Sequence, residues 1–282
     1  MHCERFINAP MTISFWDWIR PCRQGMVFFV NRGKGLSTLG KDSNFIRVLK
    51  NVIFPRRCVF CRRFLALDAG TGVCIDCMNK IPFNISYHHC KGCGRPIPEG
   101  RVYCADCARG ERYAFAKVHA AYLYEEPARL AMIRFKREWN HSFAAVFAEH
   151  MAEIIRREVS LSEIDLVVAV PPRKERMRRM DYDQALNLAM TLAKILELPC
   201  LGGVMRQKEK RRKQSSLSYE ERRRNVQGNF LVVKKEAVAG KRILLVDDIC
   251  TTGATLNECA KVLRCAGAKT VVCAVAAITG EE

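Results

Sequence analysis

The stretch "ILLVDDICTTGATL" at residues 243–256 constrains the fold of this chain more than any other. Its first four residues, 243–246, are all apolar and too few for a helix, which predicts a short buried strand. From Thr255 onward apolar residues recur at helical spacing, and Gly267 is expected to end that helix. The stretch therefore predicts a strand, a loop and a helix, with the loop where open α/β sheets bind ligands.

The predicted loop combines acidic groups with groups that bind anions. Backbone amides at a helix N-terminus favour phosphate, glycine allows close approach, and threonine hydroxyls donate hydrogen bonds. Asp247 and Asp248 would repel a phosphate, so we expect them to bind sugar hydroxyls or a hydrated metal ion. A ribose 5-phosphate fits both requirements, and an ordinary turn after an acidic strand end is the alternative. The predicted phosphate loop consists of Thr251, Thr252, Gly253, Ala254 and Thr255.

Eight of the 15 cysteines form four Cys-x-x-Cys pairs, separated by 12, 12 and 10 residues. Two such pairs complete a tetrahedral four-thiolate zinc site, so we expect two structural Zn²⁺ ions bound by sequential pairs. A disulfide framework is the less favoured alternative, because no secretory signal is evident. His88 and His89 are expected to be surface residues. The predicted ligands are Cys58, Cys61, Cys74, Cys77, Cys90, Cys93, Cys104 and Cys107.

The remainder of the chain alternates strand and helix patterns. Strands are expected at 118–124, 164–170, 230–233 and 270–278, and helices at 127–137, 142–159 and 183–198. This alternation predicts a doubly wound α/β domain with a parallel sheet. Cys250, inside the loop, is expected to be a small buried residue rather than a redox switch.

Basic charge indicates an anionic partner, either nucleic acid or polyphosphate. The net charge is +18, and residues 171–228 carry 15 Lys/Arg against 7 Asp/Glu. "PPRKERMRR" follows the strand at 164–170, so Arg173 and Lys174 are expected to face a pyrophosphate. The polar insertion at 206–230 is predicted to be a lid or binding surface, with a solvated loop as the alternative. Candidate nucleic-acid contacts are Arg211, Arg212, Lys213, Arg222 and Arg223.

"VDDICTTGAT" resembles the phosphoribosyl-pyrophosphate (PRPP) motif of type I phosphoribosyltransferases. The resemblance implies that Asp247 and Asp248 hold the ribose 2′- and 3′-hydroxyls, that the loop holds the 5′-phosphate, and that Mg²⁺ accompanies the pyrophosphate. With the paired knuckles, "VPPRKERMRRMDYDQ" and "KQSSLSYEERRRNVQGNF", residues 46 to 278 are similar to the ComF family. These are double-zinc-ribbon, phosphoribosyltransferase-like bacterial proteins associated with natural transformation. Met180 and Asp181 depart from the Arg-Gly of the family pattern.

The expected organisation is a basic, disordered extension at 1–45, a double zinc ribbon at 46–112 and a phosphoribosyltransferase-like domain at 113–282. No apolar run approaches the ~20 residues of a membrane span, and no signal peptide is evident. We therefore expect a cytoplasmic protein without stable membrane insertion.

The resemblance implies a PRPP-binding protein that acts in DNA uptake by binding single-stranded DNA, with other uptake proteins such as a helicase as partners. An active phosphoribosyltransferase and a PRPP-sensing regulator are the alternatives, and no catalytic residue is assigned. Thr251 stands where 6-oxopurine enzymes of this class carry an Asp, which disfavours that substrate class. Ribbon aromatics are expected either to stack on bases or to form a small core. These aromatics are Phe60, Phe64, Tyr87 and Tyr103.

Overall fold

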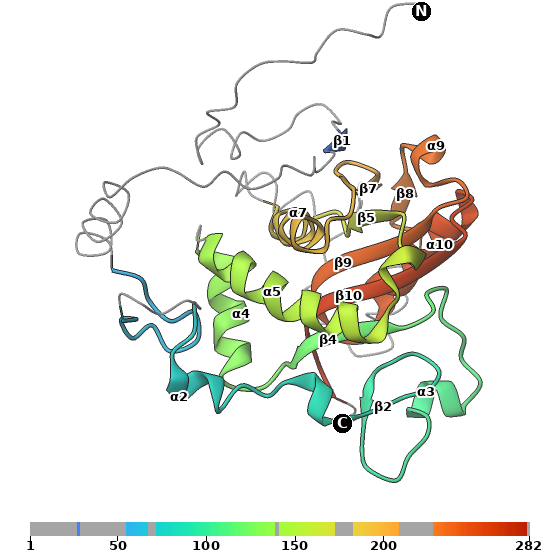
Figure 1. Ribbon diagram of the computed structural model, residues 1–282. Coiled ribbons are helices and arrows are strands. Elements are labelled where there is room, and N and C mark those ends of the chain that lie inside the picture. The colour runs from blue at the N-terminus through green and yellow to red at the C-terminus, as the bar shows by residue number, and fades with distance from the viewer. Residues whose placement is uncertain are drawn as a thin grey trace, which may run out of the picture.

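The computed structural model describes residues 27–28, 55–66, 72–138, 141–172, 183–208 and 228–280. Its main sheet has the strand order β1-β6-β5-β9-β10-β4 (Figure 1). Five strands are parallel, and β1 runs antiparallel to β6 at the edge. The predicted doubly wound parallel sheet is therefore confirmed. The strands are β1 (Val27–Phe28), β4 (Val118–Leu123), β5 (Leu166–Ala169), β6 (Cys200–Leu201), β9 (Arg242–Cys250) and β10 (Thr270–Ile278).

Successive side chains of β9 point to opposite faces of the sheet, and they are apolar on both. Helices therefore cover both faces. Leu244 and Val246 belong to the hydrophobic core beneath α4 (Ala128–Arg137), α5 (His141–Glu158) and α7 (Gln184–Leu196). Ile243 and Leu245 belong to the core beneath α10 (Ala254–Cys265) and α9 (Lys235–Val238). None of the helices in the described ranges has the length and apolar character needed to cross a bilayer.

Local sequence signals set the helix ends. Asp183 caps α7 by accepting a hydrogen bond of 3.0 Å from the Leu186 amide. At the other end Glu197 adopts the left-handed conformation with φ 56°. Gly267, with φ +95°, follows α10 as the sequence predicts. Leu161–Glu163 forms the short 3-10 helix η3 before β5.

The strand order reverses direction between β5 and β9. The chain passes from β5 through α7 to β6 on one side, and from β9 through α10 to β10 on the other. In open α/β sheets such a reversal is where a ligand crevice forms, outside the carboxyl ends of the two strands. The carboxyl ends of β5 and β9 lie side by side at this position.

The two zinc ribbons lie against opposite faces of the sheet. The first, with α2 (Ile75–Met78), joins the core of α4 and α5, and the second joins the core of α10. Figure 1 shows α2 near the end of α4 and the second ribbon well apart from it. The second ribbon contains β2 (His88–His89), β3 (Pro96–Ile97) and α3 (Ala105–Ala108), and the 3-10 helix η2 (Asn84–Ser86) precedes it.

The ribbon segments also cover the free edge of β4. The Val118 amide donates to the Cys93 carbonyl at 2.8 Å, and the Leu123 amide donates to the Pro82 carbonyl at 2.9 Å. An exposed strand edge offers unpaired backbone groups to other chains. These contacts cover both ends of this edge.

Two strand assignments differ from the sequence expectation. β8 (Phe230–Val232) pairs antiparallel with β7 (Met205–Gln207) in a separate hairpin, outside the parallel sheet. The reason is that β7, too short to be recognised in the sequence, supplies its partner. β9 also extends past the predicted 243–246 to Cys250, because its ladder with β10 continues to Ile278.

Candidate functional site

Both acidic residues of the motif lie within the last part of β9, at the crevice. Asp248 is 8% exposed, and its amide donates to Asp247 Oδ1 at 2.8 Å. The pKa of Asp247 is raised to about 8, mainly by burial and secondly by the neighbouring charge of Asp248. Two carboxyl groups held this close favour a ligand that donates hydrogen bonds to both.

Lys136 supplies a cation that the sequence analysis did not anticipate. Its Nζ lies 3.2 Å from Asp248 Oδ2, reaching the site from the last turn of α4. Its carbonyl accepts a 3.4 Å hydrogen bond from the Gln184 side chain at the start of α7. The basic end of the predicted 127–137 helix was the only sequence signal, and it did not indicate a partner.

The predicted phosphate loop, residues 251–255, joins β9 to α10 and places hydroxyl and amide groups at the helix N-terminus. Gly253 has φ +73°, which favours glycine, and its carbonyl begins α10 by accepting from the Asn257 amide. Thr252 is 7% exposed and accepts a 3.3 Å hydrogen bond from the Ala254 amide. Its hydroxyl proton is still able to donate to an anion. The Thr279 hydroxyl, just after β10, donates a hydrogen bond of 3.2 Å to the Thr251 carbonyl and so fixes the start of the loop.

Arg95 of the second ribbon lies against this loop and was also missed by the sequence analysis. The side chain is 7% exposed, and a Cβ added at Gly253 would lie 3.5 Å from its Nη2. Burial raises the pKa of Cys250 to about 11, while the Arg95 charge acts in the opposite direction. Cys250 is 3% exposed, as expected of a packing residue. The only sequence signal for Arg95 was its place directly after a knuckle.

The structure groups the knuckle cysteines as predicted, the first two pairs together and the last two pairs together. Within each group all four Sγ atoms lie within 4.8 Å of one another. Cys61 and Cys74 are 3.5 Å apart, and Cys93 and Cys104 are 3.7 Å apart. All eight are free thiols, so the disulfide alternative is wrong. His88 and His89 are exposed, as expected.

The thiol environment fits structural zinc. Burial raises the pKa of Cys58 and Cys90, but backbone hydrogen bonds outweigh it and lower both pKa values to about 7. Burial and the neighbouring sulfurs raise the pKa of Cys77 and bring that of Cys107 to about 12. Four crowded thiols therefore do not all ionise without a metal ion. A divalent cation compensates the charge of the four thiolates.

Several predicted site residues lie outside the described residues, but their flanking segments are placed. The Val170 amide donates to the Val246 carbonyl at 2.9 Å, so the chain leaves β5 beside the acidic pair. The basic insertion leaves β7 and returns through Gly228, whose amide donates to Glu258 at 2.6 Å. The outside residues are Arg173, Lys174, Arg211, Arg212, Lys213, Arg222 and Arg223.

The ribbon aromatics divide into two kinds. Phe60 is 1% exposed and packs against Tyr122 with ring centroids 5.7 Å apart, so it is a core residue and not a stacking platform. Phe64, Tyr87 and Tyr103 are 59%, 42% and 48% exposed, respectively. Phe60 differs because the first ribbon packs it against α5 and β4.

The fold and site define a class of protein: a double zinc ribbon joined to a phosphoribosyltransferase-like domain. Residues 49–108 match the double zinc ribbon domain family, and residues 182–281 match the phosphoribosyl transferase domain family. Competence protein F of Haemophilus influenzae is 30% identical over 77% of this chain and 95% of its own length. The chain therefore belongs to the competence protein F (ComF) family, and the resemblance found in the sequence is confirmed.

Other relatives carry related names. DNA utilization protein YhgH of Salmonella typhimurium is 28% identical over 77% of this chain and 94% of its own length. Competence protein ComFC of Bacillus subtilis is 26% identical over 72% of this chain and 82% of its own length. Among solved structures, a glutamine PRPP amidotransferase from B. subtilis shows 21% identity over 51% of this chain and 30% of that chain, with a TM-score of 0.35.

Proposed function

We propose that the carboxyl end of β9 binds PRPP. In this proposal the 5′-phosphate lies on the loop of residues 251–255, and the ribose hydroxyls bind Asp247 and Asp248. One observation carries the proposal: the acidic pair and the amide-rich loop meet at the point where the strand order reverses. The pyrophosphate is assigned to the segment after Pro172, which includes Arg173 and Lys174.

Mg²⁺ belongs to the same proposal. The carboxylates of Asp247 and Asp248 are hard oxygen ligands of the kind Mg²⁺ accepts, and phosphate oxygens and water usually complete its coordination. When bound, Mg²⁺ would neutralise charge on the pyrophosphate. The contribution of the chain itself is to orient the sugar and to exclude water from the buried side of the crevice.

We further propose that the protein acts in the cytosol in DNA uptake by binding single-stranded DNA, together with uptake proteins such as a helicase. The names of the relatives, competence and DNA utilization proteins, support the process. The net charge of +18 supports an anionic polymer as partner. The basic residues of the insertion are the candidate phosphate contacts. The ends of the insertion are fixed on the β7–β8 hairpin beside α10.

The PRPP proposal is tested by calorimetric titration of the zinc-loaded protein with PRPP and Mg²⁺. Pyrophosphate release is then measured against a panel of bases, with and without single-stranded DNA. Saturable PRPP binding supports the proposal, and release with one base identifies an active transferase. Absence of PRPP binding would contradict it.

The DNA proposal is tested through salt dependence. Each phosphate neutralised contributes ~0.7 to the log–log slope for a single strand, so replacing Arg211, Arg212 and Lys213 with Ala should flatten the slope by about two units. The matched control removes three exposed lysines outside the insertion, Lys241, Lys261 and Lys269, and should leave the slope nearly unchanged. Equal effects of the two triple variants would show that the insertion makes no specific phosphate contacts.

A further inference from the structure

The second zinc ribbon and the segment after it pack against the predicted phosphate loop. A Cβ added at Gly253 would lie 3.5 Å from Arg95 Nη2 and 3.7 Å from Tyr113 Cε1. The Asn257 side chain, near the start of α10, accepts a 2.7 Å hydrogen bond from the Ala114 amide. The ribbon side thus forms a wall against both the loop and the helix that follows it.

These contacts continue from the loop to the cysteines of the second ribbon. The Tyr113 hydroxyl donates to Asp106 Oδ2 at 2.9 Å, and Asp106, only 5% exposed, belongs to α3. Cys104 is the N-cap of α3 and Cys107 lies within it, so this helix carries two of the four thiol ligands. A bound zinc ion therefore fixes the helix on which the position of Tyr113 depends.

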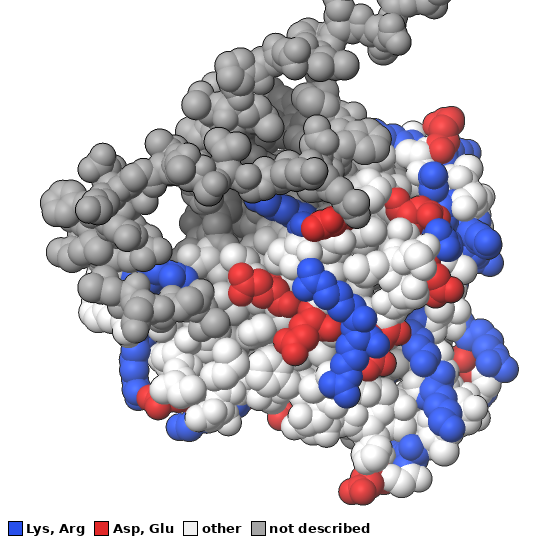
Figure 2. Space-filling view, viewed as in Figure 1, with Lys and Arg blue, Asp and Glu red and all other residues white. Residues whose placement is uncertain are grey.

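Arg95 differs from the other basic residues of the second ribbon because its side chain is buried. Its carbonyl accepts a 2.7 Å hydrogen bond from the amide of Cys90, a predicted zinc ligand. Figure 2 shows exposed basic side chains at the lower right, where Figure 1 places β2 and α3. A buried cation beside an anion-binding loop is screened less than these surface cations. The exposed basic residues are Lys91, Arg101, Arg109 and Arg112.

The ribbon is seated on the sheet at one tight position, Gly94. The φ of this glycine is +83°, and a Cβ added there would lie 2.5 Å from the Val118 carbonyl oxygen. Next to it, the Cys93 carbonyl accepts from the Val118 amide at 2.8 Å. A side chain at position 94 would therefore push the ribbon away from β4, and Arg95 would move with it.

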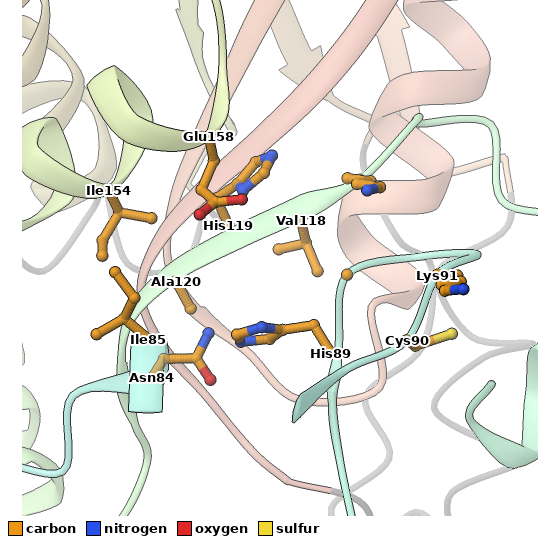
Figure 3. A pocket seen from close by; sticks show the side chains of 12 residues that line it. Asn84, Ile85, His89, Cys90, Lys91, Val118, His119, Ala120, Ile154 and Glu158 are labelled. Carbon is orange, nitrogen blue, oxygen red and sulfur yellow. The ribbon is translucent and has the colours of Figure 1, made fainter. Parts of the chain in front are cut away.

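The face of the ribbon toward α5 is less completely packed. A cavity of about 110 Å³, beside Asn84, separates the ribbon from the end of α5. Figure 3 shows Cys90 and Lys91 on one side of this cavity and Ile154 and Glu158 on the other. Atoms that line a void lack contact partners there, so the ribbon is oriented mainly by its seam with β4 and its contacts with the loop.

We propose that the second zinc ribbon is part of the PRPP site, so that zinc binding in this ribbon and PRPP binding on the loop favour each other. Arg95 and Tyr113 are the positioning residues, and they lose their common anchor when the zinc ion leaves. The first ribbon lies against the opposite face of the sheet, so its zinc ion is not coupled to PRPP in this way. The inference rests on the PRPP proposal and adds a regulatory requirement to it.

The first test moves the ribbon without removing a zinc ligand. Gly94→Ala places a methyl group against the backbone of Val118, and it should lower PRPP affinity in titration calorimetry roughly tenfold with both zinc ions retained. Gly100→Ala is the matched control. It lies in the same ribbon with φ +82°, but nothing lies within 4 Å of the added Cβ, so PRPP affinity should be unchanged.

The second test uses the reciprocity of coupled binding. If zinc in the second ribbon raises PRPP affinity roughly tenfold, saturating PRPP must tighten zinc binding in that ribbon by the same factor. Competition with a fluorescent zinc chelator, with Mg²⁺ and with or without PRPP, measures this factor. Cys77→Ser keeps the ion of the second ribbon and should show the shift, whereas Cys107→Ser keeps the ion of the first ribbon and should show none. Chelation of zinc by PRPP itself would act in the opposite direction and equally on both variants.

The outcomes separate the two proposals. If the unmodified protein does not bind PRPP, the PRPP proposal and the coupling both fail. If it binds PRPP but Gly94→Ala has the affinity of Gly100→Ala, or the two cysteine variants shift alike, the coupling alone is wrong. If Cys77→Ser does not fold, as judged by circular dichroism, the glycine pair decides the question. If Gly94→Ala does not fold, Tyr113→Phe, which removes only the hydroxyl that binds Asp106, replaces it.

Discussion

The Asp247→Asn substitution should stabilise the protein and weaken PRPP binding at the same time. Burial and the adjacent Asp248 raise the pKa of Asp247 from 3.8 to about 8. For such a group, stability is fully present below the unfolded-state pKa and is lost as the pH rises through the folded-state pKa. Asparagine keeps the shape of the side chain but has no charge to bury.

The magnitude follows from the width of the pH window. A shift from 3.8 to about 8 corresponds to roughly 5–6 kcal/mol above pH 8, at ~1.36 kcal/mol per pKa unit. Asp248 shares this titration, and Lys136 offsets part of the negative charge of the acidic pair. We therefore expect about half of this free energy. The variant should thus gain about 3 kcal/mol above pH 8 and under about 1 kcal/mol near pH 5.

Hydrogen exchange of the β9 and β10 amides, compared between pH 5 and pH 8.5 after correction for intrinsic exchange rates, measures this gain. Asp165→Asn is the matched control with the opposite sign. Hydrogen bonds from Arg242 hold the pKa of Asp165 well below its ordinary value, so removing that charge should destabilise the protein above pH 4. Calorimetry on both variants then measures PRPP affinity.

Unchanged or lower protection in Asp247→Asn at pH 8.5 would refute the argument that the buried charge of Asp247 destabilises the free protein. Unchanged PRPP affinity in the same variant would refute the ligand assignment. The two results are independent, because the first concerns the free protein and the second the complex.

Three further predictions concern the loop and the ribbons. Asp248→Ala and Thr252→Val should each weaken PRPP binding roughly 10- to 100-fold in titration calorimetry, since charge-assisted hydrogen bonds contribute ~1.5–3 kcal/mol. An Asp248→Ala variant that melts at a lower temperature with full PRPP affinity would instead indicate a packing role. Arg95→Met should lower PRPP affinity roughly tenfold, because a cation is lost beside Gly253, and the variant should keep two zinc ions. Unchanged affinity would show that Arg95 has only a structural role. Cys77→Ser should halve the zinc content measured by atomic emission, whereas the exposed Cys265→Ser should keep both ions.

Sequence alone determined the features whose parts are close together in the chain. Each knuckle pair spans only four residues, so the spacing predicted both zinc groups and their sequential pairing. The strand, acidic pair, glycine and helix of 243–265 follow one another directly, so their order indicated the fold class and the carboxyl-end site. Hydrophobic periodicity likewise predicted α7 and β10 with bounds close to those observed.

Only the tertiary structure decided which distant segments meet. Lys136 reaches Asp248 because α4 packs on one face of the sheet, and Arg95 reaches Gly253 because the second ribbon packs on the other. The antiparallel pairing of β8 and the cavity beside Asn84 also depend on contacts between separate elements. No local pattern encodes such contacts, because they arise from how complete surfaces fit together once the elements have formed.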